Sequence, residues 1–473
     1  VRPILNMKSN NDVIKMRAIA EEAFELVKKF NGSHSGEHGD GISRSEFNPI
    51  MFGEKLTNAF REVKSLMDPY GIFNPGKIVD APKMDDRHLF RFSPGYTVSD
   101  FKTELDWSTW SGSANGFQGA VEMCNNNGAC RKLKGGVMCP SFRITGQEKD
   151  STRGRANSLR LAMSGQLGPN AMTSPEMLET MKLCVSCKAC KRECPTSVDM
   201  SAMKLEVMAL KAKQNKLSIH EKLIAFLPDY APIAALFYKI LNLRNSSKFL
   251  SNLGEKLTGF SSKRNLPSWR RDWYRDNEIP SSAEGPYPVI LFIDTFNRYF
   301  EPENLRSAVR VLKNAGYSPF YPKPINKSQK ALCCGKTHLA VGNVSKAKEA
   351  AERLVSTYLP YAQDGVPIIG LEPSCLLALK DEVPSLIKTQ EAKLVSENVL
   401  TFEELLAKDK KKLSLKPIQA TALLHGHCHQ KAFNVLRPVE EVLKMIEGLQ
   451  VDTIETSCCG MAGAFGYSKE TYE

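Results

Sequence analysis

The sequence has no uninterrupted apolar run of the roughly 18 residues that a membrane-spanning helix needs. The nearest candidate, residues 223–243, is broken by Asp229, Lys239 and two prolines. Its apolar residues recur at helical spacing, which favours a pair of amphipathic helices buried against a core. The alternative is docking on a membrane surface or a partner. The segment therefore predicts helices but no membrane span.

Export and cofactor motifs are also missing. The sequence begins at Val1 without a charged region followed by an apolar run, so we expect no secretory signal. We expect a cytoplasmic location, with peripheral contact at the inner membrane as the alternative. No C-x-x-C-H haem attachment, Walker loop or dinucleotide fingerprint occurs, which argues against haem and against a nicotinamide site on this chain.

Basic residues exceed acidic residues, with 64 Lys and Arg against 52 Asp and Glu. This balance favours anionic substrates, acidic partners or an anionic surface. The basic residues are scattered and do not form the basic and aromatic motif of a known nucleic-acid module. We therefore expect no nucleic-acid partner.

The first part of the chain predicts one helical block over residues 1–92. Residues 12–30 and 53–67 have helical periodicity, and Asp12 is placed to cap the first of these helices. Residues 93–120 lack periodicity and are rich in Ser and Gly, which is typical of a linker. The whole length of 473 residues suits about three domains of usual size.

The middle of the chain carries clustered cysteines. Residues 121–205 include seven of the thirteen, and residues 174–183 predict a capped helix that leads into the densest run. Without an export signal, close-set cysteines indicate metal or cluster ligation in preference to disulfides. Residues 206–284 predict a helical, basic connector.

From residue 288 the periodicity changes. Short apolar runs such as "PVILFID" alternate with helical segments such as "ENLRSAVRVLKNAG", which predicts a parallel α/β layout. The triplet "CCG" occurs twice, which indicates two related α/β units in tandem. We expect the first over residues 285–415 and the second, incomplete, over 416–473. The predicted fold class is therefore multidomain α/β plus α.

The run "CVSCKACKRECP" is the strongest motif. It places Cys184, Cys187 and Cys190 in a C-x2-C-x2-C spacing, followed by Cys194 and a proline. Three thiolates at this spacing bind one iron–sulfur cube, and the fourth reaches a second cluster in two-cluster ferredoxins. Zinc is the alternative, but zinc sites use two cysteine pairs. The run predicts a two-cluster 4Fe–4S domain.

A second run, "CNNNGACRKLKGGVMCP", has Asn127 where a middle cysteine would stand. With crossed ligation, the complete set is Cys139, Cys184, Cys187 and Cys190, and the incomplete set is Cys124, Cys130 and Cys194. The incomplete set predicts either a three-iron cluster or a four-iron cluster with a non-cysteine fourth ligand. Asn127, solvent and an empty corner are the alternatives at that position.

The two "CCG" triplets supply adjacent thiols, which suit a cluster with spread irons or a bridging role. The alternative is two buried thiols beside a tight glycine turn. The candidate ligands are Cys333, Cys334, Cys375, Cys428, Cys458 and Cys459. His427 and His429 are either further ligands or polar turn residues. Thr295 ends the first strand where Cys428 ends the corresponding strand of the second unit.

The loop "HSGEHGDG" combines an acid and a histidine with glycines that let backbone approach a ligand. Glu37 can bind a divalent metal, and His38 can take a proton near neutral pH. A surface loop with a solvated Glu and His is the alternative interpretation.

These motifs together carry a resemblance that covers nearly the whole chain. "SGEHGDGISRSEF", with "MFGEKLTNAFREVKSLMDPYGIFNPGKIV", resembles the C-terminal end of the FAD-linked oxidases, the flavin-dependent D-2-hydroxyacid dehydrogenases. The cysteine runs with "STRGRAN" resemble the iron–sulfur segment of the large fused members, of the D-2-hydroxyglutarate or D-lactate dehydrogenase type. The "CCG" units resemble the cysteine-rich domains of glycolate oxidase iron–sulfur subunits and heterodisulfide reductases.

The resemblance implies roles for three residues: Glu37 binds a divalent metal such as Zn or Mn, His38 acts as the base, and Asn74 lies near the flavin. In the family, the histidines that bind the same metal come from an earlier segment with an H-x-x-D/G-N-x-H type pattern. This sequence lacks that pattern, and it also lacks the flavin-binding half. The fullest family pattern has an extra leading cysteine in the first "CCG" unit and a C-x2-C in each unit. This sequence lacks both features.

The resemblance further implies oxidation of a D-2-hydroxyacid to the 2-oxoacid. FAD would be bound mostly by an upstream domain or subunit, and electrons would pass through the clusters to a quinone or another acceptor. We expect an oligomer. A non-catalytic iron–sulfur electron-transfer subunit and a zinc-stabilised scaffold are the alternative functions.

Overall fold

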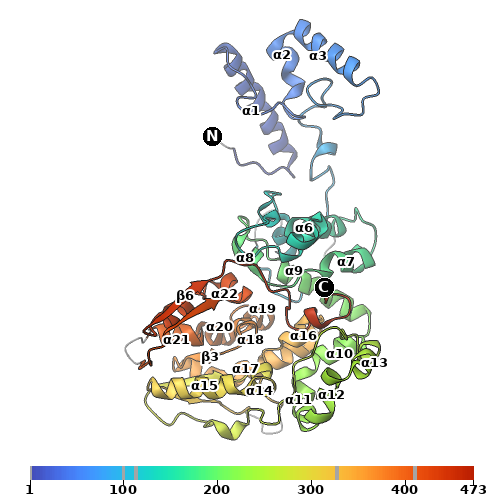
Figure 1. The fold of residues 1–473 in the computed structure, drawn as a ribbon. Coiled ribbons are helices and arrows are strands. Elements are labelled where there is room, and N and C mark those ends of the chain that lie inside the picture. The colour runs from blue at the N-terminus through green and yellow to red at the C-terminus, as the bar shows by residue number, and fades with distance from the viewer. Residues whose placement is uncertain (1–2, 99–101, 111–115, 325–329, 409–412, 473) are drawn as a thin grey trace. The chain divides into compact units, whose positions relative to one another are not determined.

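The computed structural model describes residues 3–98, 102–110, 116–324, 330–408 and 413–472. The chain divides into two compact units, Val1–Val98 and Ser99–Glu473 (Figure 1). None of the described helices is both long and apolar enough to cross a membrane.

The first unit is helical. It contains α1 (Asn10–Lys29), the short helix η1 (Ser45–Phe47), α2 (Asn48–Phe52) and α3 (Glu54–Met67). Both helices expected from periodicity are present, but Asp12 does not cap the first. Ser9 precedes α1 as the N-cap residue, and the Asp12 carboxylate accepts a hydrogen bond from the backbone N–H of Asn6 at 2.8 Å. The capping prediction was wrong because the helix begins earlier than the apolar pattern does.

The second unit begins with a group of helices around the first seven cysteines. These are α4 (Gly116–Glu122), α5 (Pro140–Thr145), α6 (Thr152–Met163), α7 (Pro175–Lys182), α8 (Ala189–Glu193) and α9 (Met200–Gln214). Ser174 caps α7 by accepting from the N–H of Met177 at 3.2 Å, as the sequence predicted. The buried Glu206 of α9 accepts from the N–H groups of Glu104 and Leu105, and so fixes the segment that precedes α4.

A lobe of four helices follows. It consists of α10 (Ile219–Ala225), α11 (Leu227–Leu236), α12 (Tyr238–Ser246) and α13 (Lys248–Thr258). Ala231 and Ala235 of α11 pack with Tyr299 in a small apolar cluster. Only one side of the lobe is buried, so the expectation of two buried helices over residues 223–243 holds for the inner side alone.

A four-stranded parallel sheet forms the largest core. Its strands are β1 (Pro288–Phe292), β2 (Ser318–Phe320), β3 (Ile368–Gly370) and β4 (Val399–Thr401), in the order β2-β1-β3-β4. The associated helices are α14 (Thr295–Tyr299), α15 (Pro302–Asn314), α16 (Lys336–Ala340), α17 (Val344–Gln363), α18 (Pro373–Ala378), α19 (Glu382–Ile387), α20 (Gln390–Glu397) and α21 (Phe402–Lys408). β1 is a continuous apolar run because both faces of the sheet are covered. The predicted parallel α/β layout is confirmed.

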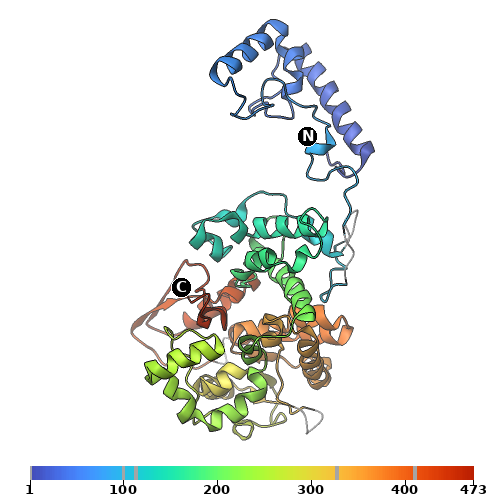
Figure 2. The same ribbon diagram turned by 90° about the vertical axis from the view of Figure 1, so that its right-hand side faces the viewer.

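A second, two-stranded parallel sheet pairs β5 (Ala420–Leu424) with β6 (Leu449–Thr453), and it is joined by α22 (Cys428–Phe433) and α23 (Arg437–Leu443). The chain then returns to the helical lobe. The N–H of Ser261 donates to the carbonyl of Tyr467 at 2.7 Å, and the N–H of Lys469 donates to Gly259 at 2.8 Å. Figure 2 shows the C-terminal residues beside the lobe.

Candidate functional site

Four thiols from the two cysteine runs line one small cavity: Cys139, Cys184, Cys187 and Cys190. Burial raises the pKa of Cys139 to about 11, and the sulfur atom of Cys184 adds to the rise. Burial also raises the pKa of Cys190 well above its ordinary value, and the other three sulfur atoms contribute. The structure therefore brings together the four cysteines of the predicted complete set.

Four thiols that line one cavity match the number and type of ligands that a 4Fe–4S cube takes. Within the described ranges, no group of three Cys, His, Asp or Glu side chains is placed to hold a single metal ion.

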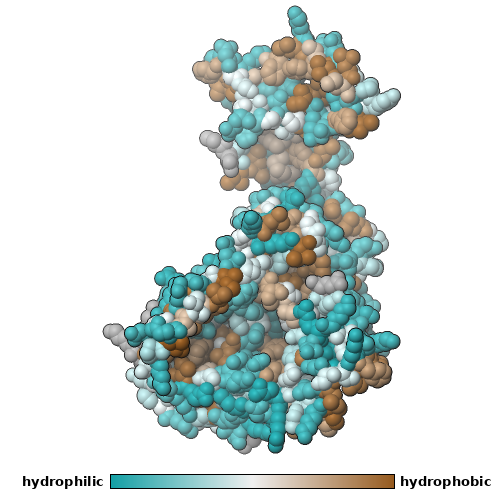
Figure 3. Space-filling view, in the orientation of Figure 1, coloured by the Kyte–Doolittle hydropathy of each residue, from teal (hydrophilic) through white to brown (hydrophobic). Residues whose placement is uncertain are grey.

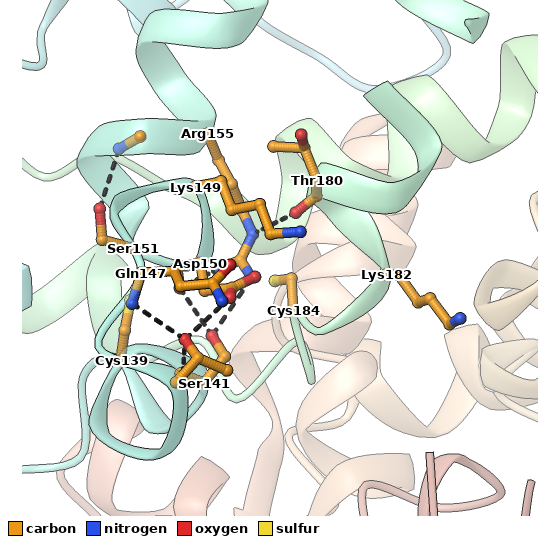
Figure 4. Close-up of polar contacts among 12 residues, drawn as sticks. Cys139, Ser141, Gln147, Lys149, Asp150, Ser151, Arg155, Thr180, Lys182 and Cys184 are labelled. Atoms are coloured by element: carbon orange, nitrogen blue, oxygen red, sulfur yellow. Dashed lines mark hydrogen bonds and ion pairs between the residues drawn. The ribbon is translucent and has the colours of Figure 1, made fainter. Parts of the chain in front are cut away.

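A buried arginine stabilises the wall of this cavity. Arg155, from α6, is almost fully buried, and its guanidinium donates to the carbonyl of Thr180 at 2.8 Å and to the carbonyl of Asp150 at 2.7 Å (Figure 4). Its positive charge lowers the pKa of Cys139, although burial outweighs it. Gly154 allows α6 to approach closely, because a Cβ there would lie 2.0 Å from the carbonyl oxygen of Glu148.

The incomplete set lies beside the complete one. The N–H of Arg153 donates to the sulfur of Cys130 at 3.4 Å, and the Arg153 guanidinium interacts electrostatically with Cys130 and Cys124. Cys130 lies in the short helix η3 (Ala129–Arg131), which contacts α8, and Cys194 directly follows α8. Cys139 also interacts with Cys130. The two predicted sets are therefore neighbours.

Asn127 is held in a local turn. Its amide nitrogen donates to Asn125 at 2.6 Å, and its carbonyl oxygen accepts from the N–H of Ala129 at 2.8 Å. These two hydrogen bonds orient the exposed Asn127 side chain within the turn.

The loop before Cys139 depends on Glu193, which lies in the run "CVSCKACKRECP". The Glu193 carboxylate accepts from the N–H groups of Val137 at 2.8 Å and Met138 at 3.1 Å. Because Glu193 directly precedes Cys194, one side chain positions ligands of both sets.

The remaining cysteines form two groups of three. Hydrogen bonds link the Cys334 thiol to Cys333 and to Cys375. In the second group, the hydrogen bond from Cys428 lowers the pKa of Cys458 to about 6, despite burial. Both groups border one cavity of about 1490 Å³, whose lining includes Cys375, Cys428, Cys458, Cys459, Glu372 and His427.

The histidines beside Cys428 make different contacts. His427 caps α22 by accepting, through Nδ1, from the N–H of His429 at 3.1 Å. Nε2 of His429 donates to the carbonyl oxygen of Ser186 at 3.1 Å, and Ser186 lies within the first C-x2-C spacing. Cys187, the next residue, interacts electrostatically with Cys458. The second cysteine-rich unit therefore lies directly against the predicted complete cluster set.

A buried ion network joins the same region to the first cysteine-rich unit. The Lys188 side chain is 3% exposed, and its Nζ lies 2.6 Å from Asp381 and 2.5 Å from Glu382. Lys336, which follows the first "CCG" triplet, pairs with Glu382 as well. Burial lowers the pKa of Lys188, but Glu382 and Asp381 raise it by more, so the ammonium group stays charged.

Lys188 and Asp294 are site residues that sequence reasoning missed. Asp294 follows β1 and is buried, and its carboxylate accepts from the N–H groups of Phe296 and Asn297, each at 2.9 Å. Burial raises its pKa to about 6, and it is a charged neighbour of Cys375. The sequence signal that could have identified Asp294 is an acidic residue at the end of a buried strand, one residue before Thr295.

In the first unit, the predicted acid and histidine are exposed. The side chains of Glu37 and His38 are 90% and 71% exposed, with Oε1 and Nε2 3.6 Å apart. Beneath them, the buried His34 lies with Nε2 3.6 Å from Asp40 and with its ring edge-on to Phe24, at 5.3 Å between centroids. The loop is thus anchored by His34, which sequence reasoning did not single out, and it presents Glu37 and His38 outward.

Asn74 lies in a turn with φ of 49°, and its side chain accepts from Lys77 at 3.4 Å. No other predicted site residue contacts it among the interactions described. The structure of the first unit alone therefore does not gather Asn74 with Glu37 and His38.

Comparison with protein families identifies three domains. Residues 1–78 match the C-terminal domain of FAD-linked oxidases, residues 120–198 match a 4Fe–4S dicluster domain, and residues 295–380 match a cysteine-rich domain. The first two domains are those of FAD- and iron–sulfur-dependent proteins, in agreement with the expected cofactor classes.

Comparison with curated proteins gives similarity over the whole chain. The chain is 25% identical to D-2-hydroxyglutarate dehydrogenase of Escherichia coli and 27% identical to that of Pseudomonas putida, with 100% of this chain and 49% of each relative covered. The chain thus spans about half the length of these relatives. It is also 28% identical to the C subunit of the anaerobic glycerol-3-phosphate dehydrogenase of Escherichia coli, over 51% of this chain and 61% of that relative. No solved structure matches.

The resemblance inferred from the motifs is therefore confirmed: the chain combines, in this order, the C-terminal domain of FAD-linked oxidases, a 4Fe–4S dicluster domain and a cysteine-rich domain.

Proposed function

We propose that the chain is part of an FAD- and iron–sulfur-dependent dehydrogenase that oxidises a D-2-hydroxyacid, such as D-2-hydroxyglutarate or D-lactate, to the 2-oxoacid. The observation that carries the proposal is the joining, in one chain, of an FAD-linked oxidase domain to thiols arranged for clusters. The whole-length similarity to D-2-hydroxyglutarate dehydrogenases supports the substrate class. When bound, FAD accepts two electrons from the substrate, and the clusters carry them singly to an acceptor such as a quinone.

His38 would take the proton of the substrate hydroxyl. Its ring is exposed and therefore accessible to a substrate. Asn74 would contact the flavin, which is bound mostly by residues outside this chain.

A divalent metal such as Zn or Mn would take Glu37 as one ligand. The described residues offer no group of three donors, so the other ligands of this metal would come from outside the described residues. Glu37 fits one corner of such a site, since the loop leaves its carboxylate exposed.

The chain would hold its clusters through thiolates. Cys139, Cys184, Cys187 and Cys190 fit a 4Fe–4S cluster, whereas Cys124, Cys130 and Cys194 fit a three-iron cluster or a four-iron cluster with solvent at one corner. The two groups of three in the cysteine-rich units would extend this series. We also infer an oligomeric assembly.

A second candidate is a non-catalytic electron-transfer subunit. It is favoured by the similarity to the C subunit of anaerobic glycerol-3-phosphate dehydrogenase, which covers only half of this chain. In that case Glu37 and His38 would be ordinary surface residues.

One variant separates the two functions. Replacing His38 by Ala in the complete flavin-loaded enzyme should lower kcat with D-2-hydroxyglutarate by about 100-fold or more, the usual contribution of a general base. Iron content and the paramagnetic resonance spectrum of the reduced clusters should not change. Unchanged turnover would favour the electron-transfer subunit, and a colourless, zinc-loaded protein would refute both redox functions.

A further inference from the structure

We propose that the outer face of α11–α13 docks on the surface of a membrane that contains anionic phospholipid. This surface, called the lobe face below, consists of the exposed side chains of these three helices. The proposal goes beyond the catalysis proposed above and does not depend on it.

The lobe face concentrates exposed apolar side chains. Residues 102–472 of the described chain contain twenty exposed large apolar side chains, and ten of them lie on α11–α13 or between these helices. They are Ile233, Leu236, Phe237, Ile240, Leu241, Leu243, Phe249, Leu250, Leu253 and Leu257. Leu241 borders the cavity of about 1490 Å³, and the other nine belong to the lobe face. Such a concentration, on three short helices, of exposed apolar side chains from residues 102–472 marks an interaction site, since isolated exposed residues are otherwise ordinary.

These side chains follow helical spacing. Positions 233, 236, 237, 240 and 243 form one stripe that continues from α11 into α12, and positions 249, 253 and 257 form a second stripe on α13. The opposite sides are buried: Ala231 and Ala234 face inward on α11, and Ser251 does so on α13. Figure 3 shows apolar surface at the lower right, where Figure 1 places α12 and α13.

The charges on the lobe face are positive. Lys239, Lys248 and Lys256 are exposed on α12 and α13. The two acidic residues of these helices are paired with other groups. Asp229 pairs with Lys330 at 3.0 Å, and Glu255 accepts from the N–H of Ser262 at 2.6 Å. The face therefore offers apolar side chains and lysines without competing exposed carboxylates.

This combination selects a bilayer surface over a protein partner. Interfacial helices insert Leu and Phe side chains between lipid headgroups and place lysines on the polar side, where each attracts anionic lipid. Protein interfaces, in contrast, are depleted in lysine at their centres. The helices are also too short to span a bilayer, so the contact would be peripheral.

Vesicle co-sedimentation of the full chain tests the proposal. We expect binding to vesicles made of equal parts phosphatidylcholine and phosphatidylglycerol, with weaker binding to pure phosphatidylcholine and loss of binding at high salt. The triple variant K239E, K248E and K256E should lower the partition coefficient by about tenfold or more, because each lysine contributes about 1 kcal/mol near an anionic surface. The variant F237Q, F249Q and L253Q should lower it on both kinds of vesicle.

The matched control replaces two apolar side chains away from the lobe face, Leu423 and Ile454, which are also exposed. L423Q with I454Q should bind vesicles as the parent chain does. The proposal is overturned if the parent chain binds neither vesicle, or if the lobe variants bind as well as the parent. It is also overturned if the lobe variants only abolish self-association, because the face would then join two copies of the chain. Hydroxyacid turnover with a water-soluble dye is measured separately, so loss of catalysis and loss of docking are distinguishable.

Discussion

Nε2 of His429 lies 3.1 Å from the carbonyl oxygen of Ser186, 243 residues earlier in the chain. A carbonyl can only accept a hydrogen bond, so Nε2 carries the proton. Burial lowers the pKa of His429 to about 3, which keeps the ring neutral at ordinary pH. A single neutral side chain thus connects the second cysteine-rich unit to the backbone between two predicted cluster ligands.

Replacing His429 by Phe should destabilise this connection. The carbonyl of Ser186, which is partly buried, would lose its donor, at a cost of about 1 to 3 kcal/mol. We expect a lower melting temperature and a lower iron content after reconstitution. His425 is exposed, so H425F is the control and should change neither quantity; equal losses in both variants would contradict the assigned hydrogen bond.

Replacing Lys188 by Met should leave Asp381 and Glu382 without their buried partner. Breaking a buried ion pair in this way costs about 3 kcal/mol or more. Urea unfolding followed by tryptophan fluorescence measures the change. Lys191 pairs with Asp381 at 2.7 Å but is half exposed, so K191M should cost about 1 kcal/mol or less. Similar costs for the two variants would show that the buried network is not the stabilising element.

Cys139→Ser and Cys194→Ser should affect different clusters. Cys139 lines the cavity with Cys184, Cys187 and Cys190, whereas Cys194 follows the helix that contacts η3. We therefore expect paramagnetic resonance of the two variants to lose or alter different signals. If both variants lose the same signal, the crossed assignment is wrong.

The stability of the second unit should fall in acid partly through His338. Burial lowers the pKa of this side chain from 6.5, and Asp229, Lys330, Lys346 and Glu349 are its charged neighbours. The unfolded chain binds the proton first as pH falls, so stability is fully present above pH 6.5 and is lost below it.

The variant H338L removes this dependence. The slope of the free energy of unfolding against pH should be smaller below pH 6.5, by at most about 1.4 kcal/mol per pH unit. Unfolding in urea at several pH values measures the slope. A variant that keeps the slope of the parent chain would assign the acid sensitivity to other groups.

The sequence predicted the elements whose pattern is local. The apolar run of β1 and the Ser174 cap have short-range causes, and both are present. The C-x2-C-x2-C spacing likewise predicted which thiols would meet. Asp12 was assigned wrongly because a cap depends on where the helix begins, which side-chain periodicity leaves open by several residues.

Long-range pairs could not be predicted. Nothing in "CKAC" indicates that its lysine meets Asp381 and Glu382, which come much later in the chain. The sequence also could not predict that the helices of residues 223–243 are buried on one side only. Amphipathic spacing predicts an apolar and a polar face, but it does not show which other part of the chain packs against the apolar face. Tertiary packing decides both.

The contact between His429 and Ser186 also orders events during synthesis. The ribosome releases the cysteines of residues 184–194 long before it releases residues 425–460. The first cysteine run must therefore wait, uncovered on one side, until the chain has been translated as far as His429, 243 residues after Ser186. An iron–sulfur carrier protein would have access to these thiols during that interval and would lose it once α22 closes over them.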